Sequence, residues 1–167
     1  MNQITSPEKI LGKGLNATFT KQSNLRPIII ATIDSTVSSI TPESNQSYMD
    51  IFVGSFSYRL TGGFEVGKTG DQVLVRTYNG GTIPKEELES LGVTNEQFIE
   101  FLQVVISNHP DTRLGEDIEY SANGFSYSYK VTSTLLLIQA TTGLEEVKYG
   151  DTVIAQHVIT ISPVLES

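Results

Sequence analysis

Apolar and polar residues alternate along several segments of the chain with the two-residue period of a β-strand. The clearest segment is residues 50–60, where Phe52, Phe56 and Tyr58 share one face and polar residues share the other. A continuous apolar run can also form a strand when it is short enough. On these two criteria the chain contains about six or seven strands, the others being residues 26–33, 71–78, 118–122, 125–131, 132–141 and 151–161.

The middle of the chain has the longer period of helices. A short helix is predicted over residues 84–91, because a proline and acidic residues suit its first turn and a glycine follows its end. A second helix is predicted to begin at Thr94, which forms a capping-box pattern with Gln97, and to end before Pro110. Its apolar stripe is expected to face a sheet and comprises Phe98, Phe101, Leu102, Val105 and Ile106.

Glycine-containing pairs mark the turns between predicted strands. Asn123-Gly124 predicts a two-residue hairpin turn, because both positions accept positive φ. Residues 65–73 align with residues 146–153 after one gap, and each segment contains a Gly-Asp pair just before a strand. We interpret the two pairs as the same turn, with glycine supplying the positive φ.

Length and composition favour one mainly β domain. The 167 residues include more than twice as many Ile, Val and Thr as Leu, Ala and Met, and β-branched residues favour strands. This length fits a single core. We predict an α+β, mainly β fold. It is expected to be an antiparallel β-sandwich or barrel over residues 25–167, with a two-helix insert near residues 83–107.

The N-terminal part of the chain is basic, whereas the rest is acidic. The first 33 residues hold four basic side chains and one acidic one, a net +3, which leaves −11 for the rest of a chain whose net charge is −8. Residues 1–24 show no sustained period and predict an irregular arm. The arm is either a frayed terminus or an interface with the acidic body of a neighbouring copy, formed by Lys9, Lys13, Lys21 and Arg26.

One segment matches a nucleotide-binding pattern. Residues 62–69 satisfy G-x-x-x-x-G-K-[ST], in which Lys68 would contact phosphates. A working P-loop opens a helix whose N-terminus holds the phosphates, whereas residues 71–78 predict a strand. A P-loop nucleotide-binding protein therefore remains only a third candidate function, and we predict no cofactor.

Few side chains are available for catalysis or metal binding. The chain has no cysteine, which excludes thiolate chemistry and cysteine-rich zinc sites. His109 fits a helix C-cap, and His157 fits a packed strand position. Acidic residues between 111 and 119 could hold calcium but lack EF-hand spacing, and the adjacent Glu145 and Glu146 are expected to be solvated. We predict no catalytic residue, no metal site and no enzyme.

Charge and hydropathy also restrict partners and location. A pI near 4.7 argues against nucleic acid, because proteins that bind the phosphate backbone present clustered Lys and Arg. The longest apolar run, residues 135–138, is too short to cross a membrane. Residues 1–11 carry no secretory signal. We therefore expect no membrane partner and a cytoplasmic location.

Aromatic residues alternate with serine on two predicted strands. Tyr58 lies on one of them, and Tyr127 and Tyr129 lie on the other. One interpretation is that the aromatic side of each strand is buried and its serine side faces solvent. The other is that the tyrosines are exposed. Exposed tyrosines could stack on sugar rings, so a carbohydrate- or peptide-binding β module is the alternative function.

In composition and layout the chain resembles small virion structural proteins of tailed bacteriophages, the head-to-tail connector, ring and tail subunits. It is acidic, cysteine-free, rich in Ser and Thr, and begins with a basic segment. The resemblance implies a non-enzymatic subunit that forms a homo-oligomer, such as a ring, and binds other structural proteins of the virion after synthesis in the host cytoplasm. It also implies a contact loop over residues 62–70, with Gly62, Gly63, Phe64 and Lys68 in the interface.

Overall fold

The computed structural model describes residues 6–19, 35–40, 46–54 and 61–164. In these residues eight strands form one antiparallel sheet in the order β1-β2-β3-β4-β8-β7-β6-β5. The elements along the chain are α1 (Pro7–Phe19), β1 (Ser35–Ile40), β2 (Gln46–Gly54), β3 (Thr61–Thr69), β4 (Gln72–Thr82), α2 (Lys85–Ser90), α3 (Asn95–Asn108), β5 (Ile118–Ala122), β6 (Phe125–Leu135), β7 (Ala140–Tyr149) and β8 (Thr152–Val164).

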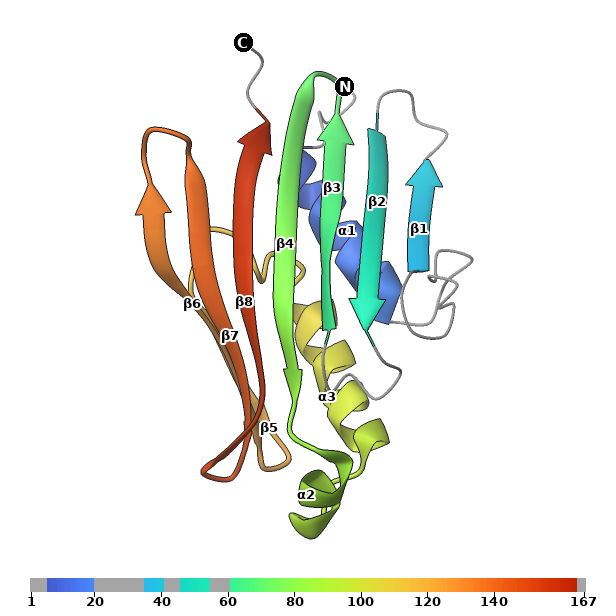
Figure 1. The fold of residues 1–167 in the computed structure, drawn as a ribbon, viewed down its shortest axis with the longest axis vertical. Helices are drawn as coiled ribbons and strands as arrows, with labels where there is room; N and C mark the ends of the chain where they lie inside the picture. The colour runs from blue at the N-terminus through green and yellow to red at the C-terminus, as the bar shows by residue number, and fades with distance from the viewer. Residues whose placement is uncertain (1–5, 20–34, 41–45, 55–60, 165–167) are drawn as a thin grey trace.

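The two halves of the chain follow the same order of elements. In each half helical structure precedes four strands that pair consecutively, and the last strands of the halves, β4 and β8, pair at the centre of the sheet. The helices α1 and α3 contact each other and lie on the same face of the sheet (Figure 1). We call this the helix face, and the opposite face the outer face.

The α+β, mainly β class is confirmed, but the expected sandwich or barrel is wrong. The strands form one sheet, and the helices form a second layer on one of its faces (Figure 1). Amphipathic helices can cover one face of a sheet as well as a second sheet can, so the alternating pattern alone did not distinguish the two arrangements. Predicted strand 26–33 and residues 55–60 lie outside the described residues.

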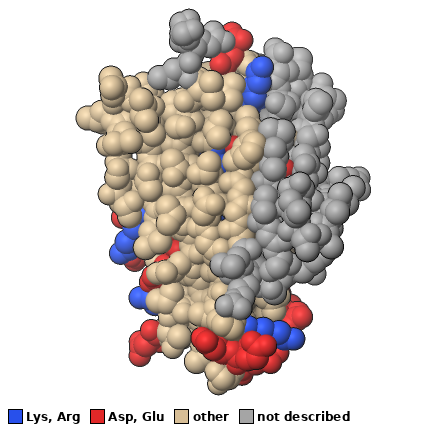
Figure 2. Space-filling view, in the orientation of Figure 1, with Lys and Arg blue, Asp and Glu red and all other residues tan. Residues whose placement is uncertain are grey.

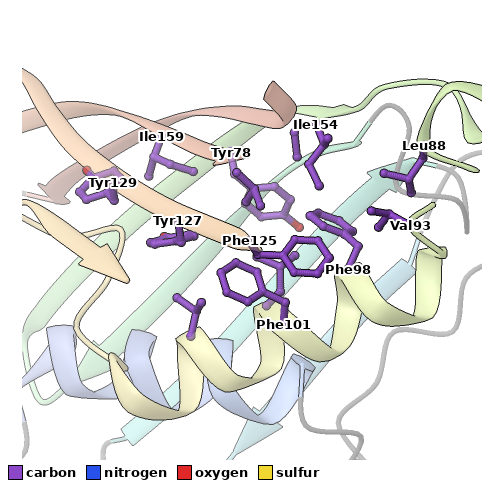
Figure 3. Packing of buried hydrophobic residues seen from close by; sticks show 14 residues of the cluster. Tyr78, Leu88, Val93, Phe98, Phe101, Phe125, Tyr127, Tyr129, Ile154 and Ile159 are labelled. Atoms are coloured by element: carbon purple, nitrogen blue, oxygen red, sulfur yellow. The ribbon is translucent and has the colours of Figure 1, made fainter. Parts of the chain in front are cut away.

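The predicted helices and their packing are confirmed. Thr94 is the N-cap of α3, and its capping box with Gln97 is complete. The whole predicted stripe of α3 is buried. Figure 3 shows Phe98 and Phe101 directed from α3 toward Phe125 and Tyr78 of the sheet. This contact forms the larger of the two hydrophobic clusters found in the described residues.

The glycine turns also form as predicted. Gly70 and Gly150 connect β3 to β4 and β7 to β8 with φ values of 58° and 57°. Asn123 and Gly124 adopt positive φ, 53° and 82°, in the hairpin between β5 and β6. The two Gly-Asp pairs therefore occupy corresponding turns in the two halves of the sheet.

The predicted irregular arm is wrong over residues 7–19, which form α1. The helix buries Ile10, Leu11 and Leu15 on the helix face and contacts β2, β3 and β4. Its apolar positions are spaced for a helix, but two glycines interrupt the segment and obscure the pattern. Lys9 and Lys13 are exposed on α1, whereas Lys21 and Arg26 lie outside the described residues.

Candidate functional site

The most exposed apolar group in the described residues is the turn between β6 and β7. Its side chains lie at the end of a long hairpin, and Leu136 and Leu137 are 85% and 93% exposed. Leu135 and Ile138 beside them are 53% and 48% exposed. We call residues 135–138 the apolar tip.

The apolar tip corrects the strand predicted over residues 132–141. Leu135 pairs with Ala140, and residues 136–139 form the turn, where Gln139 adopts a φ of 54°. A run of apolar residues between β-formers has the sequence signature of a buried strand. The sequence therefore predicted a continuous strand through this segment, whereas the structure has a turn between two strands there.

The hairpin is uncharged as well as apolar at its tip. From Val131 to Leu144 the sequence contains no Asp, Glu, Lys or Arg. Surface apolar groups of this kind mark interaction sites when they are contiguous. An uncharged hairpin can enter an apolar pocket of another molecule without burying a charge.

The helix face contains a buried polar network that starts at Arg76 of β4. The guanidinium, which has no exposed surface, donates to Glu65 of β3 at 2.6 and 3.0 Å. Tyr48 of β2 donates to the same carboxylate at 2.6 Å. Burial alone would raise the pKa of Glu65, but the adjacent Arg76 outweighs it and lowers that pKa. Glu65 is therefore ionised inside the protein.

A second centre of the network surrounds Glu145 of β7. Its carboxylate accepts hydrogen bonds from Arg113 at 2.7 Å and from Tyr127 at 2.7 Å. His157 Nδ1 lies 3.2 Å from the same carboxylate. Burial would raise the pKa of Glu145, but Arg113 and His157 together lower it. The prediction that Glu145 is solvated is therefore wrong, since only 2% of the residue is exposed.

The two centres occupy equivalent positions in the two halves of the sheet. Tyr48 pairs with Gly67, two residues after Glu65, and Tyr127 pairs with Val147, two residues after Glu145. Each glutamate also lies four residues before the end of its strand. The repeated arrangement of elements thus includes a repeated tyrosine–glutamate pair.

Thr61, His157 and Glu145 form a row across the sheet. Thr61 Oγ1 is 2.7 Å from His157 Nε2, so hydroxyl, imidazole and carboxylate follow in the order of a catalytic triad. The row passes over Gly80 of β4, where a Cβ would lie 2.7 Å from the Cα of His157. Only 7% of Thr61 is exposed, which leaves little room for a substrate. We interpret the row as a structural bridge between β3 and β7.

The tyrosines that the sequence offered as exposed binding residues are buried where the structure describes them. Tyr127 and Tyr129 are buried, at 1% and 0% exposure, so the proposal of exposed aromatics is wrong for both. They face α3 because the serines of β6 occupy the outer face. Tyr58 lies outside the described residues.

The proposed contact loop is strand β3. Gly62, Gly63 and Phe64 pair with β4, and Lys68 pairs with Val73. The P-loop pattern of this segment therefore opens no helix, and its backbone groups belong to a β ladder. The alternating apolar residues Phe64 and Val66 were the sequence signal for a strand.

Other candidate sites are resolved as follows. His109 is the C-cap of α3, as predicted. Among the described residues no group of three or more His, Asp or Glu side chains is arranged to hold a metal ion. No helix in the described part of the chain is long and apolar enough to cross a membrane.

The outer face of β5, β6 and β7 contains a polar groove of about 520 Å³. Serine and charged side chains line it, among them Ser126, Ser128 and Lys130. Ion pairs join Lys130 to Glu119 and Lys148 to Glu146, each at 3.2 Å. The groove therefore offers hydroxyl groups and paired charges rather than an aromatic surface.

Comparison with known proteins gives no relative for this arrangement. No protein-family model matches the chain, and no curated protein or solved structure shows significant similarity to it.

Proposed function

We propose that the chain is a non-enzymatic assembly subunit that binds a neighbouring subunit through its apolar tip. The observation that carries this proposal is the exposure of four consecutive large apolar side chains at the end of a hairpin. Full burial of one such side chain stabilises a complex by roughly 1.5–3 kcal/mol. Burial of all four would contribute roughly 6–12 kcal/mol before the cost of association is subtracted.

A protein pocket fits the tip better than a lipid surface does. Segments that bind membranes combine apolar residues with Lys or Arg for anionic lipids and with Trp or Tyr at the interface. The hairpin from Val131 to Leu144 contains none of these residues, and the chain has a net charge of −8. An apolar pocket in another subunit imposes neither requirement.

The most concrete form of the proposal is a ring, connector or tail component of a phage virion, located in the virion after assembly in the host cytoplasm. The support for this form is the resemblance in composition and layout alone. In this form the partners are copies of the same chain and other structural proteins of the particle.

A carbohydrate- or peptide-binding module is the second candidate function, favoured by the polar groove on β5, β6 and β7. Its hydroxyl and charged groups suit an extended polar ligand. The buried tyrosines do not contribute stacking surfaces. Retention of the chain on glycan or peptide arrays, lost on Ser128→Lys, would favour this candidate.

The apolar tip is tested by the double variant Leu136→Asp/Leu137→Asp. We expect the wild-type chain to form multimers larger than dimers, and the double variant to lose them while keeping its thermal midpoint, because the tip is exposed in the subunit. Light scattering after size exclusion gives the masses, and calorimetry gives the midpoint.

Ser133→Asp is the matched control, since it adds a charge to the exposed part of the same hairpin outside the tip. A wild-type chain that stays monomeric at every concentration, or equal masses for wild type and double variant, would contradict the proposal. Flotation of the wild type with neutral phosphatidylcholine vesicles would point to a lipid partner instead.

A further inference from the structure

The outer face of the sheet carries apolar side chains that the described helices leave uncovered. Alternation along β3, β4, β7 and β8 places on this face the side chains of Phe64, Val66, Val73, Val75, Leu144 and Val158. We call these six residues the outer apolar patch. The helix α1 contacts β2, β3 and β4 from the opposite face. Val158 lies at one end of the patch, where it pairs with Leu144 and is 49% exposed, and the other five side chains are partly exposed.

Charged residues border the patch and do not enter it. On the outer face β4 and β8 present only Val, Thr, Ser, Asn, Gln and Gly. Lys68 lies at one end of the patch, beside Val73. Among the described residues, Glu119, Lys130, Glu146 and Lys148 form ion pairs on β5, β6 and β7 of this face. Figure 2 shows charged side chains gathered at the lower end of the molecule and along its lower left side. Thr77, Thr160 and Ser162 lie between Val158 and Leu144 at one end and the other four apolar residues, so the patch combines apolar with uncharged polar side chains.

We propose that the outer apolar patch binds the same patch of a second copy of this chain, so that two sheets pack face to face around a two-fold axis. This inference rests on the proposed assembly function and deepens it by naming one partner. The two sheets would then form a sandwich between subunits, with the helices outermost. Sheets that pack in this way lie about 10 Å apart and interdigitate side chains from both faces.

The size of the patch fits a dimer. Four strands about 4.8 Å apart and the seven residues from Val73 to Asn79 at about 3.3 Å each give a face of roughly 19 by 23 Å, or about 440 Å² in projection. A standard interface buries roughly 800 Å² of accessible surface per partner. The accessible surface of a face covered with side chains exceeds its projected area, so this face alone approaches the required size.

The charge distribution favours a second copy as the partner. Two chains that each carry −8 repel one another over most orientations. The outer patch is a region where they can approach without placing like charges opposite each other. At its border the ion pairs Lys130–Glu119 and Lys148–Glu146 keep the charge balanced. Self-association through this face therefore removes apolar surface from water without a buried charge.

Val158→Lys in the full-length chain tests the inference. A lysine at this position would place an unpaired charge inside the interface, so we expect the dimer dissociation constant to rise at least about a hundredfold. Sedimentation velocity over a concentration series measures it. Ser128→Lys, on the same face but outside the patch, is the matched control and should leave the dimer intact.

Leu136→Asp/Leu137→Asp separates this inference from the tip contact. If both contacts form, that variant stops at dimers, and adding Val158→Lys to it gives monomers. Dimers that Val158→Lys disrupts, without any larger species, would support the inference and overturn the tip contact. A tip variant that is monomeric at every concentration, beside a wild type that forms larger multimers, would overturn the inference alone.

A cross-link gives a second readout that does not depend on a destabilising charge. Because the chain has no cysteine, Val158→Cys introduces a single thiol, and we expect a bis-maleimide to link it efficiently to its copy. The exposed Glu86→Cys on α2 should give little product. Equal cross-linking at the two positions would overturn the inference. So would a wild-type chain that is monomeric while Val158→Lys only lowers the stability of that monomer.

Discussion

Arg76 is fully buried at the centre of the sheet, and its hydrogen bonds compensate for the removal of its charge from water. Besides Glu65, its guanidinium donates to the carbonyl oxygens of Thr112 and Arg113 at 3.4 and 3.3 Å, and to that of Leu11 at 3.5 Å. These carbonyls belong to α1 and to the segment after α3. One side chain therefore ties both helical segments to the sheet.

Arg76→Met is expected to lower the free energy of unfolding by about 3–5 kcal/mol, because it leaves the carboxylate of Glu65 buried without its counter-charge. Urea unfolding followed by circular dichroism measures the change. The double variant Arg76→Met/Glu65→Gln, which removes both charges, should recover part of the loss. A single variant as stable as the wild type would show that the pair is not needed.

Asp50 on β2 is a second buried acid, 4% exposed, which accepts a hydrogen bond from Tyr78 at 2.7 Å. Burial, followed by the nearby charge of Glu65, raises the pKa of Asp50 from 3.8 to about 7. A raised acid pKa means that the folded chain binds this proton more tightly than the unfolded chain does. On this account the free energy of unfolding falls as pH rises from about 4 to 7.

Asp50→Asn should therefore stabilise the protein more at pH 8 than at pH 5. Because the raised pKa is about 7, only the interval from pH 5 to about 7 contributes, which sets an upper bound of about 3 kcal/mol on this difference. Urea titrations of both proteins at the two pH values measure it. The exposed Asp151→Asn is the control, and equal effects at the two pH values would contradict the raised pKa.

At the scale of elements, α1 approaches both the segment after α3 and the sheet closely because its glycines lack side chains. A Cβ on Gly12 would lie 2.4 Å from the carbonyl oxygen of Pro110, and one on Gly14 would lie 2.2 Å from the ring of Tyr48. That ring is held by its hydrogen bond to Glu65. The same glycines that weaken the helix locally allow it to pack.

Gly14→Ala tests this balance between local preference and packing. Alanine favours an isolated helix over glycine by about 1 kcal/mol, but here its methyl group meets the ring of Tyr48. We expect a net destabilisation of about 1–3 kcal/mol, measured by urea unfolding. Lys13→Ala, on the exposed side of α1, should change stability by less than about 0.5 kcal/mol. A Gly14→Ala variant more stable than the wild type would show that the packing is looser than described.

At the scale of the whole molecule, burial and interaction surfaces are divided between the two faces of one sheet. The helix face holds the apolar cores and the polar network with its two equivalent centres. The outer face and the hairpin end hold the exposed apolar residues of the described chain that our proposals use. The sheet therefore presents the patch and the tip to different neighbours.

Elements with a complete local signal were predicted well. The capping box at Thr94, the stripe of α3 and the Asn123-Gly124 turn each depend on residues within a few positions of one another. The repeated Gly-Asp turns are of the same kind. For α1 the local signal was incomplete, because Gly12 and Gly14 reduce helix propensity and the stabilising contacts come from the sheet.

The sequence by itself determined the mainly β class, the turns, α2 and α3, because periodicity, caps and positive φ act over short distances along the chain. Only the tertiary structure decided that one sheet is covered by helices, that Glu65, Arg76 and Glu145 are buried together, and that residues 135–138 are exposed. Those outcomes depend on which distant segments pair. The local sequence of a charged residue or an apolar run is the same whether that residue is exposed to water or packed against another strand. Its environment is therefore decided by the pairing of the strands.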